Sequence, residues 1–383
     1  MNKKINFFLL TFVSIFIIGC QSDEVVVEEP ADLLKIQSIV EIDNSWSKNI
    51  FSNPSAGKNN IVLDDQGTYT FSSEGLVSLF SNDGSLDWEV DLGIDLSSGV
   101  GKEFGSLFVT SIDGEVFSLN SNNGNINWIS SVEGESLSVP SSNGDIVAVQ
   151  TTNGKITALN LKDGKFRWEY ISVLPSLSLR GTSSPVFDDS ALYVGFANGN
   201  LAMIEPRSGV VQWEVPVTIS KGASEIERII DVDSKPKIST GIAFATSYQG
   251  DVTAINVRTG RVIWRNSFSS TKDIFEFERN IFVVDEESEV QAFSGLTGIS
   301  LWKTSDYRLR NLTSPVKVEN FLVVGDFEGY LHFINIENGK PEGRYRASRS
   351  GILALQSYKN SLVSLDLSGC LLYTSDAADD LLC

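Results

Sequence analysis

The sequence predicts an all-β fold, an eight-bladed β-propeller built from four-stranded antiparallel blades. Two observations predict it. A tryptophan recurs at intervals of about 40 residues, and short sequence motifs that contain glycine recur around that tryptophan. A repeat of this length, made of short strands and turn residues, is typical of a propeller or a related array. Gly343 occupies the position at which the same spacing would place an eighth tryptophan. The seven tryptophans are Trp46, Trp88, Trp128, Trp168, Trp213, Trp264 and Trp302.

The repeat at residues 95–131 shows how one unit becomes a blade. Its four predicted strands cover residues 95–100, 106–111, 115–120 and 125–131. The Asp-Gly pair between the second and third strands is a hairpin signal, because glycine tolerates the positive φ that tight turns require. A second glycine precedes most of the tryptophans by four residues. We expect each indole to be a wedge between adjacent blades, with its N–H bonded to a carbonyl, rather than a surface on which a ligand stacks.

The two ends of the chain are expected to close the ring together. A strand that contains Trp46 has no preceding inner strands, while residues 351–355, 361–366 and 369–373 supply three strands that lack a fourth. Pairing the first strand with these three removes the open edges of the ring. The propeller is therefore predicted to span residues 41–373, with a composite eighth blade.

The N-terminus predicts export and lipid attachment. Lys3 and Lys4 precede an apolar run at residues 5–18, which is too short to span a bilayer comfortably and is typical of a secretory signal. The following word, IIGC, resembles the bacterial lipobox and ends at Cys20. We expect residues 1–19 to be a signal peptide and Cys20 to carry lipid that holds the body at a membrane surface. An ordinary signal with a chance cysteine is the alternative.

Two further segments flank the predicted propeller. Residues 20–40 are expected to be a flexible tether behind the lipid, because the stretch after Cys20 is acidic and poor in aromatic residues. Gln21 stands where an Asp would favour retention at the inner membrane, so the outer membrane, facing the periplasm, is predicted. Residues 374–383 lose the alternation and read as a non-native or disordered tail. No structural disulfide is predicted, although the compartment would permit one.

The charge of the chain bears on its partners. Lys and Arg number 30 against 49 Asp and Glu, which gives a formal net charge of −19. Such a charge repels phosphate backbones and anionic membrane surfaces. The sequence therefore predicts no nucleic-acid partner and membrane contact through the lipid anchor only.

The residues offer no catalytic or metal-binding constellation. The single histidine, His332, lies in a predicted strand of blade seven, where a packing role is expected. The chain has no Cys/His cluster at metal-ligand spacing, no G-x-S-x-G elbow and no phosphate-binding glycine loop. We therefore predict no cofactor, no metal and no enzymatic activity. The Gly-x-x-x-Trp ending is similar to that of quinoprotein dehydrogenases, so a propeller that binds pyrroloquinoline quinone or another small ligand in the periplasm is the alternative.

Two stretches interrupt the regular spacing. The intervals from Trp168 to Trp213 and from Trp213 to Trp264 are longer than the basic repeat, and both place their surplus after the outer strand. Such loops of consecutive blades emerge side by side on one face, where propellers place recognition. Residues 174–181 and 224–233 are therefore expected to share a surface on which leucines rimmed by charge contact a protein. The alternative is that the leucines fold inward and the carboxylates are solvated caps.

Three segments resemble the BamB family, lipoproteins of the outer-membrane β-barrel assembly machinery: PSLSLRGTSSP (175–185), SEIERIIDVDSKP (224–236) and LTSPVKVENFLVVGDFEGYLHFINIENG (312–339). The resemblance runs from Trp46 to Gly369. It implies a non-enzymatic scaffold that binds the periplasmic POTRA domains of the subunit BamA and assists the folding and insertion of outer-membrane proteins. It also implies that BamA is contacted by Leu177, Leu179, Arg180, Asp231 and Asp233. Capture of unfolded client proteins by blade edges is a second hypothesis, weaker because no long unpaired edge can be read.

Overall fold

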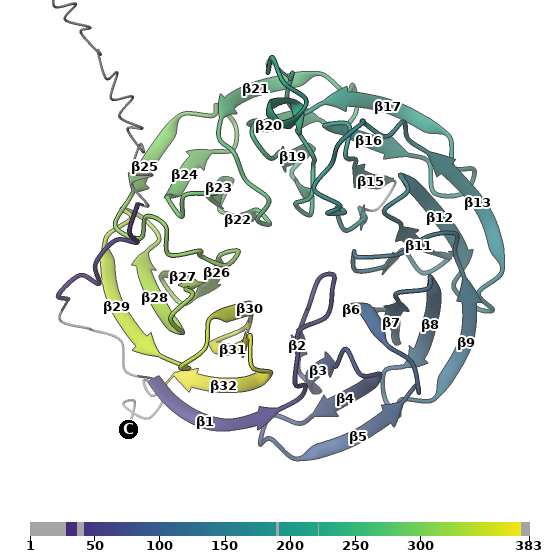
Figure 1. Cartoon of the computed structure of the whole chain (residues 1–383), viewed down its shortest axis with the longest axis horizontal. Coiled ribbons are helices and arrows are strands. Elements are labelled where there is room, and N and C mark those ends of the chain that lie inside the picture. The colour runs from purple at the N-terminus through teal and green to yellow at the C-terminus, as the bar shows by residue number, and fades with distance from the viewer. Residues whose placement is uncertain (1–27, 37–41, 189–190, 221, 377–383) are drawn as a thin grey trace, which may run out of the picture.

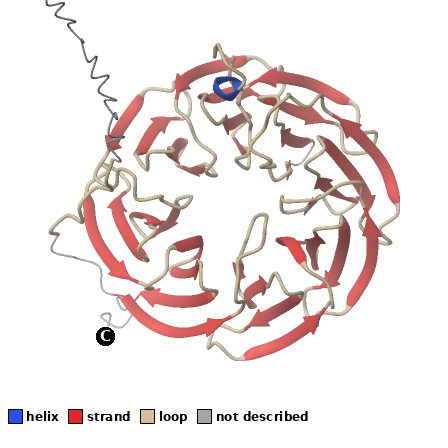
Figure 2. Ribbon diagram, in the orientation of Figure 1, coloured by secondary structure: helices blue, strands red, loops and turns tan. Residues whose placement is uncertain are grey.

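The computed structural model describes residues 28–36, 42–188, 191–220 and 222–376. Within them, eight four-stranded antiparallel sheets are arranged radially around a central axis (Figure 1). Strands and loops make up nearly all of this part of the chain, and one short 3-10 turn, η1 (Ile226–Arg228), interrupts a loop (Figure 2). The predicted fold class, an eight-bladed propeller of four-stranded blades, is confirmed. The predicted signal peptide and Cys20 lie outside the described residues.

The first four blades follow one another along the chain. They consist of β2 (Val62–Asp64), β3 (Gly67–Phe71), β4 (Leu76–Phe80) and β5 (Leu86–Asp91); β6 (Leu96–Glu103), β7 (Ser106–Ser111), β8 (Glu115–Asn120) and β9 (Ile126–Ser131); β10 (Ser141–Ser142), β11 (Ile146–Gln150), β12 (Lys155–Asn160) and β13 (Phe166–Ile171); and β14 (Val186–Phe187), β15 (Leu192–Gly195), β16 (Asn200–Ile204) and β17 (Val211–Pro216).

The remaining blades complete the ring. They consist of β18 (Lys237–Ser239), β19 (Ile242–Thr246), β20 (Asp251–Asn256) and β21 (Val262–Ser267); β22 (Phe275–Phe277), β23 (Asn280–Val284), β24 (Val290–Ser294) and β25 (Ser300–Thr304); β26 (Val316–Val318), β27 (Phe321–Gly325), β28 (Tyr330–Asn335) and β29 (Pro341–Arg346); and β30 (Ile352–Tyr358), β31 (Ser361–Asp366), β32 (Cys370–Asp376) and β1 (Ile42–Asn49). In each blade the first strand lies nearest the axis and the fourth lies at the rim (Figure 1).

The local sequence explains why the strands begin and end where they do. The predicted strands of the repeat at residues 95–131 correspond to β6, β7, β8 and β9. In β7 the residues Leu107, Phe108 and Val109 are all fully buried, since both faces of a central propeller strand are covered by neighbouring blades. Gly114, in the turn between β7 and β8, has a φ of 85°, a conformation that glycine adopts without strain.

Each tryptophan joins its blade to the next one. The indole of Trp128 packs under Gly164 of the following blade, where a Cβ would come within 2.6 Å of the ring. Its Nε1 donates a hydrogen bond of 2.7 Å to the carbonyl of Leu161. The predicted wedge role is confirmed, and the recurrent turn glycine is explained by the indole that it accommodates. The other six pairs are Trp46/Gly84, Trp88/Gly124, Trp168/Gly209, Trp213/Gly260, Trp264/Gly298 and Trp302/Gly339.

The eighth slot, Gly343, has a topological reason to lack a tryptophan. Each indole packs against the turn that joins the third and fourth strands of the next blade. In blade eight these strands are β32 and β1, which come from opposite ends of the chain, so no turn joins them. A tryptophan at position 343 would therefore find no equivalent glycine to pack under.

The ring is closed by both ends of the chain, as predicted. Strand β1 pairs antiparallel with β32 along its length, and Trp46 stacks on Tyr373 with ring centroids 5.4 Å apart. Strand β32 continues to Asp376, beyond the boundary that we expected at residue 373, because the long β1 offers backbone partners that far. Residues 377–383, the rest of the expected tail, lie outside the described residues.

The connections divide between two faces of the ring. Neighbouring strands of a blade are antiparallel, so the loops that join one blade to the next emerge on the same face as the turns between second and third strands. We call this side the loop face. The turns between third and fourth strands lie on the opposite face. Both long insertions, residues 172–185 after β13 and residues 217–236 after β17, belong to the loop face.

Candidate functional site

Two neighbouring interblade loops on the loop face form the candidate site. The main-chain N–H of Leu179 in the first loop donates a hydrogen bond of 2.7 Å to Oδ2 of Asp231 in the second. Near the C-terminal ends of the same two loops, Oγ of Ser183 donates a hydrogen bond of 2.8 Å to the carbonyl of Ser234. The structure thus brings together the two segments that the sequence predicted to share a surface.

The leucines of the first loop point to solvent. Leu177 is 43% exposed and Leu179 is 41% exposed, and Leu174 in the same loop is equally accessible. The alternative that these side chains fold inward is therefore wrong. Exposed leucines on a loop tied to its neighbour are a typical feature of a protein-contact surface, because their apolar area is ready to be buried.

Arg180 lies beside these leucines and has a charged partner that the sequence did not indicate. Its guanidinium Nη2 lies 2.7 Å from Oε2 of Glu135, and its side chain is 74% exposed. Glu135 belongs to the short loop between β9 and β10, the equivalent interblade loop of the preceding blade. Because that loop has ordinary length, its spacing gave no sign of a role. Three successive interblade loops therefore contribute charge or apolar surface here.

The two aspartates are buried, and our expectation that they share the surface is wrong. Asp231 is 0% exposed and Asp233 is 7% exposed. The physical reason is that the first loop folds over both of them. A Cβ on Gly181 would lie 2.3 Å from Oδ2 of Asp233, so only glycine allows this close approach. The aspartates consequently position the first loop rather than face a partner.

Burial also changes the acidity of these aspartates. It raises the pKa of Asp231 to about 7, with the nearby charge of Asp233 adding to the effect and the N–H of Leu179 opposing it. Burial likewise raises the pKa of Asp233 to about 6, while Lys58 opposes the shift and Glu286 adds to it. Oδ1 of Asp231 is buried without a hydrogen-bond partner among the described residues. The acid that holds Leu179 is thus only partly ionised near neutral pH.

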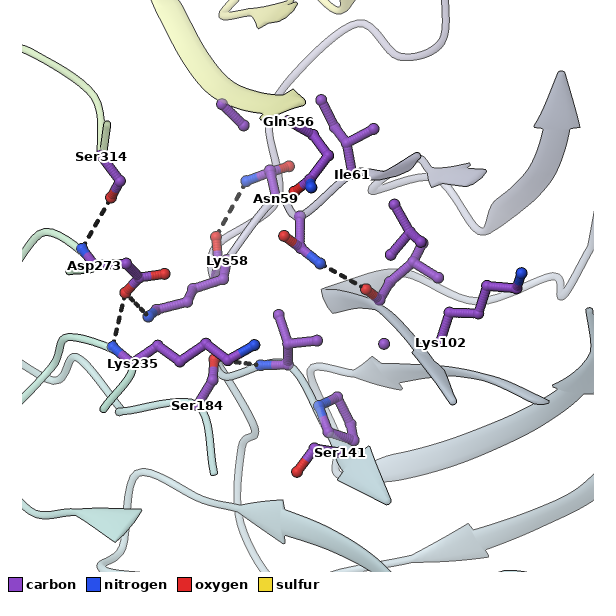
Figure 3. Close-up of a pocket in the computed structure, with 18 of the residues that line it drawn as sticks. Lys58, Asn59, Ile61, Lys102, Ser141, Ser184, Lys235, Asp273, Ser314 and Gln356 are labelled. Atoms are coloured by element: carbon purple, nitrogen blue, oxygen red, sulfur yellow. Dashed lines mark hydrogen bonds and ion pairs between the residues drawn. The ribbon is translucent and has the colours of Figure 1, made fainter. Parts of the chain in front are cut away.

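A cavity of about 450 Å³ lies on the axis, lined mainly by interblade loops. The loop at residues 52–60 reaches into it, and Nζ of Lys58 lies 3.1 Å from Oδ1 of Asp273 on the far side (Figure 3). The lining also includes Lys102, Lys235 and Glu103, and partial burial raises the pKa of the Glu103 carboxyl to about 6. It is therefore polar and carries charges of both signs.

His332 is buried, as the packing interpretation required. It is 2% exposed, and its Nε2 lies 2.8 Å from Oδ2 of Asp326. The same carboxylate oxygen accepts a hydrogen bond of 2.8 Å from Nε of Arg310. Burial lowers the pKa of His332, although Asp326 opposes the shift, so the imidazole is neutral at pH 7.

In the described part of the chain, no group of three or more His, Cys, Asp or Glu side chains could hold a metal ion. No helix among the same residues has the length and apolarity needed to cross a membrane. Cys370 is a free thiol, whereas Cys20 and Cys383 fall outside the described ranges.

Sequence comparison assigns the family. The family model described as outer membrane protein assembly factor BamB matches residues 73–304 and 259–351. The chain belongs to the BamB family. It is 32% identical over 365 residues to the outer membrane protein assembly factor BamB of Yersinia pestis, covering 90% of this chain and 92% of that relative. It is 34% identical over 339 residues to BamB of Escherichia coli (strain K12), covering 84% and 86%.

Solved structures show the same architecture. The crystal structure of BamB from Moraxella catarrhalis superposes with a TM-score of 0.80 at 24% identity and covers 88% of this chain and 100% of that one. Quinohemoprotein alcohol dehydrogenase from Comamonas testosteroni superposes with a TM-score of 0.71 at 12% identity, covering 88% and 77%. At these identities the two likenesses show the fold alone. The propeller is therefore common to BamB and to quinone-dependent enzymes.

Proposed function

We propose that this chain is an assembly factor for outer-membrane proteins, acting as a non-enzymatic scaffold that binds the POTRA domains of BamA. Membership of the BamB family supports the general role. A single observation supports the proposed binding surface. Leu177 and Leu179 are exposed on a loop whose backbone is hydrogen-bonded to the buried Asp231. We further propose that lipid on Cys20 anchors the propeller to the periplasmic face of the outer membrane.

The geometry suggests how such a surface would bind. A loop already held by a neighbouring blade loses little conformational entropy on docking, so more of the contact energy appears as affinity. Burying the exposed remainder of each leucine is worth about 1 kcal/mol. Arg180 would add orientation rather than much affinity, because exchanging Glu135 for an acidic group on BamA replaces one ion pair by another. Asp233 supports the loop from below.

Co-purification with BamA from detergent-solubilised membranes tests the proposal. We expect Leu177→Ser/Leu179→Ser to weaken the affinity for BamA about thirtyfold, which corresponds to the loss of roughly 2 kcal/mol, and to reduce the recovered BamA accordingly. Leu296→Ser is the matched control, because Leu296 is 50% exposed but lies in a turn of the opposite face. A double variant that folds normally and retains wild-type recovery would refute the docking site, and so would an equal loss in the control.

The outer strands at the rim of the propeller support a second candidate function, the capture of unfolded client proteins. Strands β9 and β13 each end their sheet, so no other strand among the described residues pairs with the outer backbone edge of either. They also carry exposed apolar side chains, among them Ile129 at 52% and Phe166 at 62%. An extended client segment could add to such an edge. We expect Ile129→Lys/Phe166→Lys to weaken photo-crosslinking of an unfolded barrel protein to this rim, since charge on an edge strand discourages pairing. Undiminished crosslinking would remove this candidate.

The competing function is a quinoprotein or another small-ligand binder that uses the axial cavity. It predicts quinone absorbance in the purified protein, or a melting temperature that rises with calcium. We expect neither, and a pulldown dominated by barrel-assembly subunits instead. Quinone bound at stoichiometric amounts would overturn the scaffold proposal.

A further inference from the structure

Residues 28–36, which precede the propeller, lie along the outer side of blade seven (Figure 1). The N–H of Ala31 donates a hydrogen bond of 2.9 Å to the carbonyl of Arg308. The carbonyl of Ala31 in turn accepts from Nη1 of Arg310 over 3.0 Å. Part of the stretch that we expected to be a flexible tether is thus attached to the propeller by its backbone.

The segment has a definite direction across the rim. Its first described residue, Glu28, forms an ion pair with Arg308, which lies in the interblade loop between β25 and β26 on the loop face. Farther along, the carbonyl of Leu34 accepts from Nη1 of Arg344 in β29 over 3.0 Å. Ile36 lines a small hollow together with Pro341, the residue at which β29 starts from the opposite face. The segment therefore runs from the loop face to the opposite face.

Strand β1 starts on that opposite face. Its last residue, Asn49, pairs with Cys370 next to a turn of the loop face, and the following N–H, that of Ile50, donates to the carbonyl of Gly369 over 2.9 Å. Its first residue, Ile42, is at the other end of the strand. Without the attached segment, the N-terminal part of the chain would leave the propeller from the face opposite the candidate site.

The attached segment supplies a hydrogen-bond acceptor to the buried guanidinium of Arg310. Arg310 is only 3% exposed, and its guanidinium is paired with Asp326 and with Glu328. The carbonyl of Ala31 accepts the hydrogen bond of a remaining nitrogen. Because a buried guanidinium is tolerated only when its donors have acceptors, removing the segment would leave a polar group poorly satisfied. The contact is therefore favoured by more than surface attraction.

We propose that residues 28–36 are a strap that carries the lipid-anchored end of the chain to the loop face and makes that face the membrane-proximal one. This inference rests on the proposed lipid anchor at Cys20. Eight steps along the chain separate Cys20 from Glu28, and each step spans at most about 3.5 Å, so the rim of the loop face stays within about 28 Å of the anchor. A chain free up to Ile42 would reach roughly 75 Å and would hold neither face toward the lipid.

The strap and the candidate docking loops share one face. Residues 177–180 would consequently be presented toward the bilayer, and a POTRA domain bound there would lie between the propeller and the membrane. The strap would thus orient the propeller so that its docking loops face the membrane. The contacts that do this are separate from the docking loops themselves.

Energy transfer from a labelled propeller to an acceptor lipid tests the orientation. The lipidated full chain, with Cys370→Ser and Cys383→Ser, is placed in phospholipid vesicles that contain the acceptor. A donor dye is attached either at Arg349→Cys, in the loop-face connection after β29, or at Glu337→Cys, in the opposite-face turn before β29. Both positions are exposed and belong to blade seven, so a tilt of the ring affects them alike. We expect stronger transfer from position 349.

Two variants weaken the strap contacts while the chain keeps its length. One replaces residues 28–36 with a glycine-serine linker of equal length, and the other is Arg308→Ala/Arg344→Ala, with Arg207→Ala on the opposite face as the matched control. We expect the difference between the two dye positions to disappear in the linker variant, to shrink in the double alanine variant, which keeps both Ala31 contacts, and to persist in the control. Unchanged melting of the propeller verifies that the fold is intact.

The possible failures are distinguishable. Equal transfer from both positions in the wild-type chain, or a difference that survives the linker replacement, overturns the strap proposal alone. A wild-type chain that does not associate with vesicles overturns the anchor and the strap together. Recovery of BamA in detergent reports on the docking loops independently, and we expect the linker variant to retain it.

Discussion

The N–H of Leu179 and the buried carboxylate of Asp231 are joined by a 2.7 Å hydrogen bond across two interblade loops. One of these residues exposes an apolar side chain and the other is inaccessible to solvent. The leucine surface is therefore positioned by an acid that no partner could touch. A change confined to the interior of the propeller should alter binding at its surface.

Removing that acid tests this relationship. Asp231→Ala deprives the Leu179 N–H of its acceptor, and we expect faster hydrogen exchange at this amide and a several-fold loss of recovered BamA. Asp231→Asn is the matched control, because its amide oxygen still accepts a hydrogen bond, and recovery should stay near the wild-type value. If Asp231→Ala binds as well as the wild-type chain, the loop does not depend on this contact.

The raised pKa values of Asp231 and Asp233 predict a pH dependence of stability. Asp231, with a pKa of about 7, and Asp233, with a pKa of about 6, keep protons in the folded state that the unfolded chain releases above about pH 4. The unfolded state then binds fewer protons, so the free energy of unfolding falls as pH rises from about 4 to 7. At about 1.4 kcal/mol for each unit by which a folded pKa exceeds the unfolded one, we expect the fall due to this pair to be at most roughly 6 kcal/mol. Asp231→Asn/Asp233→Asn should flatten the curve measured by denaturant titration, and a slope equal to that of the wild-type chain would contradict the shifts.

Gly181 offers a steric test of the same loop. A Cβ at this position would lie 2.3 Å from Oδ2 of Asp233, so Gly181→Ala should displace the loop and cost about 1 to 3 kcal/mol. We expect BamA recovery to fall while the propeller remains folded by circular dichroism. Ser176→Ala, at an exposed position in the same loop, should be neutral. Equal recovery from both variants would show that the loop tolerates displacement.

The wedge role of the tryptophans makes a graded prediction. Trp128→Ala should lower the free energy of unfolding by about 3 to 5 kcal/mol, because it empties the space under Gly164. Trp128→Phe keeps a ring there and loses the hydrogen bond to Leu161, so a smaller cost of about 1 kcal/mol is expected from that bond. Denaturant unfolding of both variants measures the difference. An alanine variant as stable as its parent would show that the indole is not a wedge.

Much of the fold could be predicted because the signals are local. Gly114 marks a hairpin through its own backbone conformation, and the alternation around Trp128 marks an outer strand whatever lies elsewhere in the chain. Closure by β1 followed from counting, since a strand containing Trp46 had no blade of its own. The surplus after Trp168 and after Trp213 placed two loops on one face, because antiparallel strands leave no other exit.

The repeat, its register, the composite blade and the neighbouring positions of the two long loops all follow from the order and spacing of residues along the chain. Which side chains of those loops face solvent depends on how the loops pack: Leu177 and Leu179 are exposed, whereas Asp231 and Asp233 lie beneath them. The tertiary structure also brought Glu135 to Arg180 and residues 28–36 to blade seven. The physical reason is that burial and ion pairing depend on neighbours distant in the chain, which neither spacing nor alternation encodes.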